Sequence, residues 1–460
     1  MGPVSLGAEL EEQIERWRGF AQRRQAISVS DVEELEDHLR SQISDLQATG
    51  LDEGESFLVA MKRLGDLDAV SREYAREHSE RLWKQLVLVP QGSAGAGGAG
   101  GTSPWVEVAF VLAAAVGAGL AVKAGMWWDR EGLQVAGSLG RTLSLLVAPF
   151  LAAYLGWKRR LSLRAIVAVL VPFLVLAILL NAYPFAPGGS TDILAALHAP
   201  VVLWVLIGVV YVGGRWRSDA RRMDFVRFTG ELAVYYALLG MGGAVLIGLT
   251  AGALGLVGVD FEPVLEQWIL PFAVPGALVV AAWLVEAKQS VVENIAPVLT
   301  RVFTPLTTLM LLVLLGVLAA AGGVVDVDRE VLILMDAILV LVLCLVLYSI
   351  SARDPLSGPG LFDGLQLVLV LAALAVDMVM LAAMVTRIAE FGSSPNKVAA
   401  LGLNVLLLVH LAGTAWLTAG FVRGRGSFAA VERWQTRYLP VYGGWAAVVV
   451  VVFGPVFGFV

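Results

Sequence analysis

The chain has little that a soluble enzyme or a disulfide-rich protein would need. Its 460 residues include one cysteine, Cys344, and four histidines. One cysteine excludes a disulfide within the chain and a metal cluster held by cysteines. Charged residues make up 16% of the sequence, whereas an average soluble protein carries about 25%. The composition therefore argues against a soluble globular fold.

Several sequence motifs of enzymes are also absent. The chain has no P-loop, so we expect no ATPase activity of its own, and it has no His-Glu-x-x-His motif of a zinc protease. It has no Gly-x-Ser-x-Gly elbow of a serine hydrolase. The run Gly-Arg-Gly-Ser at 424–427 is too short to indicate a phosphate-binding loop. We therefore expect no enzyme, no cofactor and no bound metal.

The N-terminal part of the chain is acidic. Residues 1–90 contain 11 Lys/Arg and 18 Asp/Glu, a formal charge of −7, whereas the whole chain carries −6. An acidic head argues against nucleic-acid binding, which needs a basic face. It also argues against a head that lies flat on anionic lipid. Residues 1–25 lack the apolar run of a signal peptide.

Long hydrophobic runs dominate the rest of the sequence, which is 58% hydrophobic with a mean hydropathy of +0.76. From Trp105 onward these runs have roughly the length at which an α-helix crosses a bilayer, where only helices satisfy the backbone. We predict an all-α, polytopic transmembrane bundle over 105–460. Its eleven expected spans are 105–122, 142–157, 165–182, 193–213, 231–257, 268–286, 303–321, 331–350, 364–386, 398–420 and 441–460.

The charges of the loops predict the orientation. With residues 1–90 in the cytoplasm, the loops on that side carry 16 Lys/Arg and the opposite loops carry six. Positively charged loops stay on the cytoplasmic side. We therefore expect a multi-pass protein of the cell (inner) membrane, in contact with the lipid bilayer, with a cytoplasmic N-terminus and an extracytoplasmic C-terminus.

Residues 1–90 are expected to form a small bundle of three or four helices. Asp52 is placed to cap a helix that ends at Gly65. Residues 91–104 are rich in glycine and predict a flexible linker. A head on such a linker favours regulation, or the binding of a cytoplasmic protein partner by residues 1–90.

Two stretches of this head carry a family resemblance. Residues 31–40, Asp-Val-Glu-Glu-Leu-Glu-Asp-His-Leu-Arg, and 57–66, Phe-Leu-Val-Ala-Met-Lys-Arg-Leu-Gly-Asp, resemble the permease prefix domain. That helical module precedes membrane proteins, mainly in actinobacteria and related groups. Residues 292–297, 301–306, 348–354 and 394–402 resemble the uncharacterised polytopic membrane domain that often follows it. The resemblance implies a permease-like membrane protein and supplies no catalytic residues.

Four polar residues lie inside expected spans eight to ten: Asp336, Asp377, Asn404 and His410. Ionisable groups within a span are costly and often mark an ion or proton pathway. Because consecutive spans usually pack as neighbours, these residues are expected to form an outward-open cation or proton site. Alternatively, Asp377 pairs with His410 or a hydroxyl and only holds helices together. For His410 itself the structural role is favoured.

Further charged residues gather at the expected cytoplasmic face. They either form a gate or a dock for the head, or make ordinary ion pairs near the headgroups, which contribute little. The group comprises Glu286, Lys288, Glu293, Asn294, Arg301, Arg353 and Asp354. Trp434 and Tyr438 precede the last expected span and are interpreted as interface anchors.

These patterns leave more than one function open. The first is a permease-like protein with cation- or proton-coupled transport of a small solute, in which Asp336 and Asp377 are the coupling groups and the head regulates. The alternative is a non-transporting envelope sensor or scaffold that signals through the head. A membrane enzyme acting on lipid-linked substrates is a third reading, for which only the mixed charged cluster speaks. The sequence names no ligand.

Overall fold

The computed structural model describes two compact units of the chain. One unit comprises Met1–Gly101 with Lys288–Glu293, and the other Thr102–Ala287 with Asn294–Val460. All regular elements of the described residues are helices. The described residues are 10–11, 14, 29–48, 51–64, 104–130, 138–256, 259–287, 295–320, 329–353 and 357–460.

The first unit contains helices α2 (Val29–Ala48) and α3 (Glu53–Leu64). Leu39 and Ile43 of α2 are fully buried against Ala60 of α3, which is the helical periodicity expected of a packed face. The backbone N–H of Glu55 donates to Asp52 Oδ1 at 2.7 Å, so the predicted cap by Asp52 is confirmed. The sequence also predicts a last helix from Asp66 or Asp68 to about Leu86, and these residues lie outside the described part.

An ion pair between Arg40 and Glu11 also stabilises this helical unit. Arg40 of α2 donates to Glu11 Oε1 at 2.7 Å and to Oε2 at 2.9 Å, and it donates to Glu36 one turn away on its own helix. The hydrogen bond from Arg40 lowers the pKa of Glu11 below its ordinary value. Arg40 therefore ties the chain around Glu11 to the face of α2.

The second unit is an integral membrane bundle. Eleven of its helical segments, counted among the described residues, are long and apolar enough to cross a membrane, so the predicted fold class is confirmed. The helices are α5 (Pro104–Arg130), α6 (Ser138–Lys158), α7 (Leu163–Ala182), α8 (Ser190–Tyr211), α9 (Asp219–Leu256), α10 (Glu262–Val264) continuing through the π-helical turn η1 (Leu265–Ile269) into α11 (Leu270–Ala287), α12 (Ile295–Ala320), α13 (Arg329–Ser351), α14 (Leu361–Phe391), α15 (Pro395–Val422) and α16 (Phe428–Val456).

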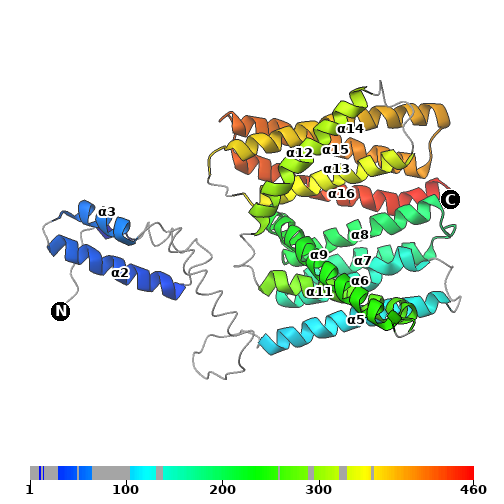
Figure 1. The fold of residues 1–460 in the computed structure, drawn as a ribbon, viewed down its shortest axis with the longest axis horizontal. Helices are drawn as coiled ribbons and strands as arrows, with labels where there is room; N and C mark the ends of the chain where they lie inside the picture. The colour runs from blue at the N-terminus through cyan, green and yellow to red at the C-terminus, as the bar shows by residue number, and fades with distance from the viewer. Residues whose placement is uncertain are drawn as a thin grey trace. The chain divides into compact units, whose positions relative to one another are not determined.

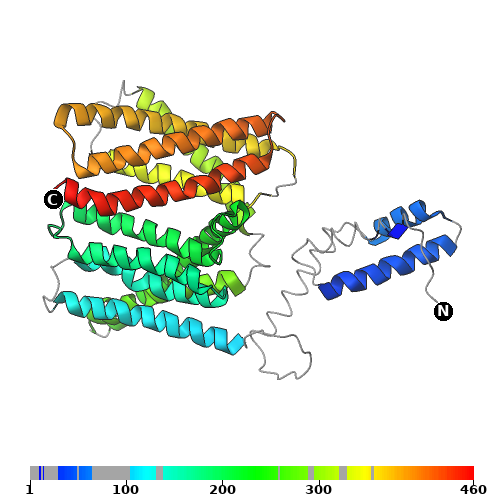
Figure 2. The ribbon, with the colours of Figure 1, turned by 180° about the vertical axis from the view of Figure 1, so that it is seen from behind.

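Most of these helices lie roughly parallel to one another, and α9 crosses the bundle obliquely (Figure 1). α8 and α16 lie side by side near the middle, as the view from behind also shows (Figure 2). The interior is divided into two apolar clusters. One is built mainly from α5 to α8 and α11, and the other from α12 to α16. Val205 of α8 contacts Gly443 of α16 between them, where an added Cβ would lie 2.8 Å from Val205 Cγ2.

Successive spans reverse direction, so alternate connections share one end of the bundle. The connections at 158–163, 211–219 and 422–428 lie at the same end, and they carry Arg160, Arg217 and Arg423 among other basic residues. We call this the basic end. Arg141, which the sequence places in a loop at the other end, is instead buried inside α6 and forms an ion pair with Asp192 of α8.

Several spans are longer than predicted, and three of them gain polar turns. α16 begins at Phe428 instead of 441, α9 begins at Asp219 instead of 231, and α14 continues to Phe391, so that Arg387 and Glu390 belong to the helix. The added turns are rich in polar residues, which lower hydropathy without ending a helix. Pro440 also favoured a predicted start of the last span after residue 440, because proline commonly interrupts a helix. In the structure Pro440 lies inside α16.

Candidate functional site

Asp336 and Asn404, two of the four polar residues expected at the site, are joined directly. Asn404 Nδ2 on α15 donates to Asp336 Oδ1 on α13 at 2.8 Å. The same nitrogen donates at 3.0 Å to the carbonyl oxygen of Ala400, one turn earlier on its own helix. Asn404 is fully buried, and its Oδ1 has no hydrogen-bond partner among the described residues. The pair fixes α13 to α15 and leaves one amide acceptor unused.

Asp377 of α14 is the most isolated of the four side chains. Its exposed fraction is 0%, and neither carboxylate oxygen has a hydrogen-bond partner among the described residues. It interacts electrostatically with Asp336 and with Tyr442. The alternative in which Asp377 pairs with His410 or a hydroxyl is therefore not observed. Asp377 and Asn404 together offer three buried acceptor atoms and no donor to match them.

His410 of α15 faces α16 and pairs with a tyrosine. Its Nδ1 lies 2.9 Å from the hydroxyl of Tyr442, and its ring stacks on Tyr438 with 4.5 Å between centroids and 14° between planes. Trp434 Nε1 donates to the His410 carbonyl oxygen at 3.0 Å. Tyr442 therefore contacts the imidazole and lies within electrostatic range of Asp377.

A second polar pair extends the site along the same interface. Gln435 Nε2 on α16 donates to Thr414 Oγ1 on α15 at 2.9 Å, and Thr414 in turn donates to the carbonyl oxygen of His410. Gln435 also interacts with the imidazole, although Gln435 Oε1 and His410 Nε2 each lack a partner at hydrogen-bond distance among the described residues. The imidazole is therefore surrounded by α16 side chains.

Two glycines of α15 receive tryptophans of α16 on either side of His410. A Cβ added at Gly402 would overlap the indole of Trp445, and one added at Gly413 would overlap the indole of Trp434. Eleven residues separate the two glycines, and eleven separate the two tryptophans, which is about three helical turns. The two contacts set the register of α15 against α16.

The sequence did not place these α16 residues in the site. Trp434 and Tyr438 were interpreted as interface anchors, because the last span was expected to begin at 441. In the structure Trp434, Tyr438 and Tyr442 occupy one face of α16 at a spacing of four residues, and they cover His410. That spacing is the signal that predicts a helix through this region.

The described residues among those expected at a cytoplasmic gate make separate contacts. Arg353 Nε donates to Asp363 Oδ1 of α14 at 2.7 Å, and its guanidinium lies 4.8 Å and 4.4 Å from the ring centroids of Phe421 and Phe428. Arg301 is exposed on α12. Arg353, which follows α13, therefore contacts one end of each of the helices α14, α15 and α16. Glu293, Asn294 and Asp354, together with Lys288, lie outside the described residues.

Glu286 belongs to a different network at the basic end. Its Oε1 accepts a hydrogen bond from Arg159 at 2.7 Å, and Lys158 lies 3.9 Å from Oε2. Lys158 also bonds Glu107 of α5 at 2.7 Å, and Tyr154 donates to the same oxygen at 3.0 Å. This network joins α5, α6 and α11, whereas Arg353 contacts Asp363 of α14, Phe421 of α15 and Phe428 of α16.

Among the residues that the structure describes, no group of three or more His, Cys, Asp or Glu side chains could hold a metal ion. The four predicted residues are instead distributed over two connected places, an acidic part with Asp336, Asp377 and Asn404, and an aromatic part around His410. No protein-family model, no curated protein and no solved structure matches this chain. The resemblance to a permease prefix domain therefore stays a prediction.

Proposed function

We propose that this protein is permease-like and couples the movement of a small solute to a proton or a small cation bound at Asp377. The observation that carries the proposal is the burial of both Asp377 carboxylate oxygens without a partner. An ionisable group inside a membrane span is costly, so its presence favours a functional role. Asp336 and Asn404 complete the proposed site.

The chemistry of the site favours the proton over a metal cation. The unpartnered atoms of Asp377 and Asn404 are all acceptors, and an ionised carboxylate buried in this way is strongly disfavoured. Asp336 of α13 brings a second carboxylate, which accepts a hydrogen bond from Asn404. Divalent cations such as Ca²⁺ take about six to eight oxygen ligands, more than this group supplies. A single proton on Asp377 neutralises the carboxylate and needs fewer oxygen ligands than a metal cation does.

The site is closed in this conformation, because Asp377, Asn404 and His410 have no exposed surface. A transport cycle would therefore include a second conformation in which Asp377 meets water. Proton uptake from one side of the membrane and release to the other, each in an open conformation, would couple the site to the movement of a solute. Tyr442 of α16 and His410 of α15 are the residues we propose for passing a proton along the interface of these two helices.

The burial of the site also favours a second candidate function. A site that stays closed would suit a non-transporting envelope sensor or scaffold, in which protonation changes helix packing and the head signals to a partner. Net movement of protons or solute distinguishes the two, because only the transporter carries charge from one side of the membrane to the other.

For both functions we propose the same orientation and partners. The basic end would face the cytoplasm, since positively charged connections stay on that side, in the inner membrane of the cell. Residues 1–90 would then bind a cytoplasmic protein and regulate the membrane unit. The proposal includes neither an enzymatic step nor nucleic acid.

The site is tested by the thermal stability of the detergent-purified protein across pH and across monovalent and divalent ions. A ligand that binds only the folded state raises stability by mass action. We expect lower pH to stabilise the wild type and Asp377→Asn to lose this response. Glu390→Gln is the matched control, because it makes the same acid-to-amide change at an exposed position of α14. Equal responses of all three proteins would contradict the site.

Transport is tested separately in proteoliposomes that receive a pH jump, with the internal pH followed by an enclosed dye. We expect a proton flux in the wild type and in Glu390→Gln and none in Asp377→Asn. A pH-dependent stability without flux would remove the transporter and leave the sensor. Flux that persists in Asp377→Asn would show that protons follow a different path.

A further inference from the structure

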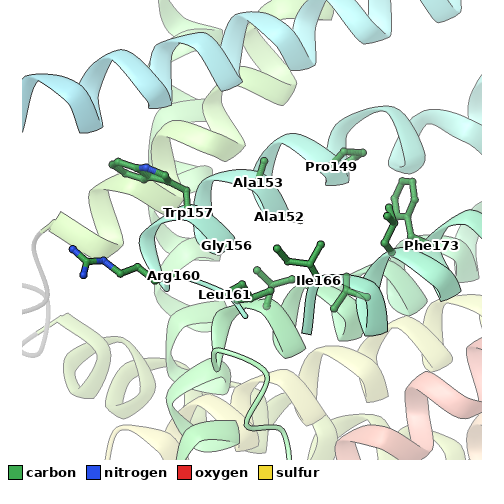
Figure 3. A pocket seen from close by; sticks show the side chains of 12 residues that line it. Pro149, Ala152, Ala153, Gly156, Trp157, Arg160, Leu161, Ile166 and Phe173 are labelled. Atoms are coloured by element: carbon green, nitrogen blue, oxygen red, sulfur yellow. The ribbon is translucent and has the colours of Figure 1, made fainter. Parts of the chain in front are cut away.

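A groove of 640 Å³ lies between α6 and α7, with α8 below it (Figure 3). This volume falls within the range of about 300–1,000 Å³ that is common for small-molecule sites. Ile166, Leu170 and Phe173 of α7 line one side. Both helices are membrane spans, and α7 is buried over only 11% of its span. The groove therefore opens where the surrounding medium is lipid.

α7 packs more tightly over its second half than over its first. Its buried side chains are Leu176 and Leu180, in its second half, while Ile166 in its first half is 43% exposed. The facing part of α6 carries small residues, among them Ala153 and Gly156. A Cβ added at Gly156 would lie 3.6 Å from Val210 of α8. Large side chains of α7 thus face small residues of α6, and the groove lies between them.

One end of the groove carries positive charge. Arg160 lies at that end, whereas Pro149 and Phe173 lie at the opposite one (Figure 3). Arg160 is in the short turn between α6 and α7, where its φ of 48° is left-handed. Arg164 is exposed on the first turn of α7. This is the basic end of the bundle, where the helices end and the lipid headgroups begin.

We propose that this groove binds an acyl chain of an anionic phospholipid, with Arg160 and Arg164 beside the phosphate. The apolar walls match an acyl chain, and an arginine guanidinium donates to phosphate oxygens in a paired geometry that suits them. The bound chain fills the space between α6 and the first half of α7, and the lipid thereby supports the position of α7. The inference does not depend on Asp377.

The experiment uses the full-length protein, delipidated in detergent, and measures lipid binding by native mass spectrometry. Phosphatidylglycerol and phosphatidylcholine with the same acyl chains are titrated in parallel. Arg160→Asn and Arg164→Gln remove the charges, and asparagine tolerates the left-handed backbone at residue 160. Arg217→Gln is the matched control, because Arg217 is exposed at the same end of the bundle but lies in the turn between α8 and α9, not where α6 passes into α7. Ala153→Trp fills the groove from an exposed position.

We expect the wild type to prefer phosphatidylglycerol, and each arginine substitution at the groove to lower this preference about fivefold, as for one basic residue near an anionic surface. Ala153→Trp is expected to weaken the binding of both lipids, and Arg217→Gln to change neither. Thermal midpoints measured in parallel verify that each variant is folded. Equal binding of the two lipids by the wild type, an equal loss in Arg217→Gln, or unchanged binding by Ala153→Trp would each overturn the proposal.

Discussion

Lys123 of α5 donates a hydrogen bond to the carbonyl oxygen of Gln267 in the π-helical turn that precedes α11. Pro271 explains why that oxygen is available. In an α-helix the carbonyl of Gln267 would accept from the N–H of residue 271, and proline has none. The Lys123 ammonium also lies 4.2 Å from the ring centroid of Trp268. A side chain of one span thus satisfies a backbone group that a proline leaves open in another.

The same relationship occurs between α7 and α16. The hydroxyl of Tyr183 donates to the carbonyl oxygen of Val451 at 3.0 Å, and Pro455 follows Val451 by four residues. Prolines are tolerated in membrane helices where neighbouring groups take over the lost hydrogen bond. Both prolines therefore act as sites of contact between helices.

We expect Lys123→Met to lower the free energy of unfolding by about 0.5–1.5 kcal/mol, since it removes a partly buried hydrogen bond. In a Pro271→Ala background the new N–H can serve Gln267, so the same substitution should matter less. Thermal midpoints of the four proteins of this cycle measure the coupling. Strictly additive effects would show that Lys123 and Pro271 are independent.

Arg353 should be intolerant of change although it lies near the basic end. Arg353→Met leaves Asp363 half of a broken ion pair, and removing one partner of a buried pair destabilises by about 3–5 kcal/mol. Arg353→Lys should recover part of this loss, because lysine keeps the charge and loses the planar contact with Phe421 and Phe428. Arg425→Met, at an exposed position of the α15–α16 turn, is the control. A loss in Arg353→Met no larger than in the control would contradict the prediction.

The head should respond to acid through Glu11. Its pKa is lowered in the folded state by the hydrogen bond from Arg40. A group with a lowered folded pKa adds stability above its unfolded pKa, and this stability is lost as the pH falls through the folded value. Since the pair is partly exposed, we expect less than about 1 kcal/mol.

Hydrogen exchange of the α2 amides in the full-length protein, corrected for intrinsic rates, measures this effect. Protection should fall between about pH 5 and pH 3, around and below the ordinary pKa of glutamate. Glu11→Gln should show a weaker dependence on pH. Parallel curves for the two proteins would mean that Glu11 does not contribute.

Gly402 should not accept a side chain. Gly402→Ala places a methyl group against the indole of Trp445, and overpacking of this kind costs about 1–3 kcal/mol. Gly420→Ala is the control on the same helix, because an added Cβ there meets nothing within 4 Å. Trp445→Ala should make Gly402→Ala harmless. Equal thermal midpoints for the two glycine variants would contradict the assigned contact.

Much of the fold could be predicted from hydropathy alone. The eleven spans follow from long apolar runs, because the bilayer imposes one length on every helix. Hydropathy could not locate the polar extensions of α9 and α16, whose charged side chains lie beyond the apolar runs or are satisfied by neighbours. Arg222, for example, pairs with Asp219 inside the first turn of α9.

The candidate site was predictable only in part. Asp336, Asp377, Asn404 and His410 are conspicuous because each interrupts an apolar run. Their partners are not, since Tyr442 and Gln435 resemble ordinary residues until the helix that carries them is placed against α15. The unpartnered state of Asp377 could not be predicted either, because it depends on how three other helices pack around it.

The paired Gly–Trp contacts restrict how the buried site can reach water. Sliding α16 along α15 by one turn would drive both indoles into backbone, so these two helices travel together as a rigid hairpin. His410 and Tyr442 then keep their spacing through any such motion. Separation of α13 from this hairpin would break the Asp336–Asn404 hydrogen bond, so this bond helps to keep water from the site on that side.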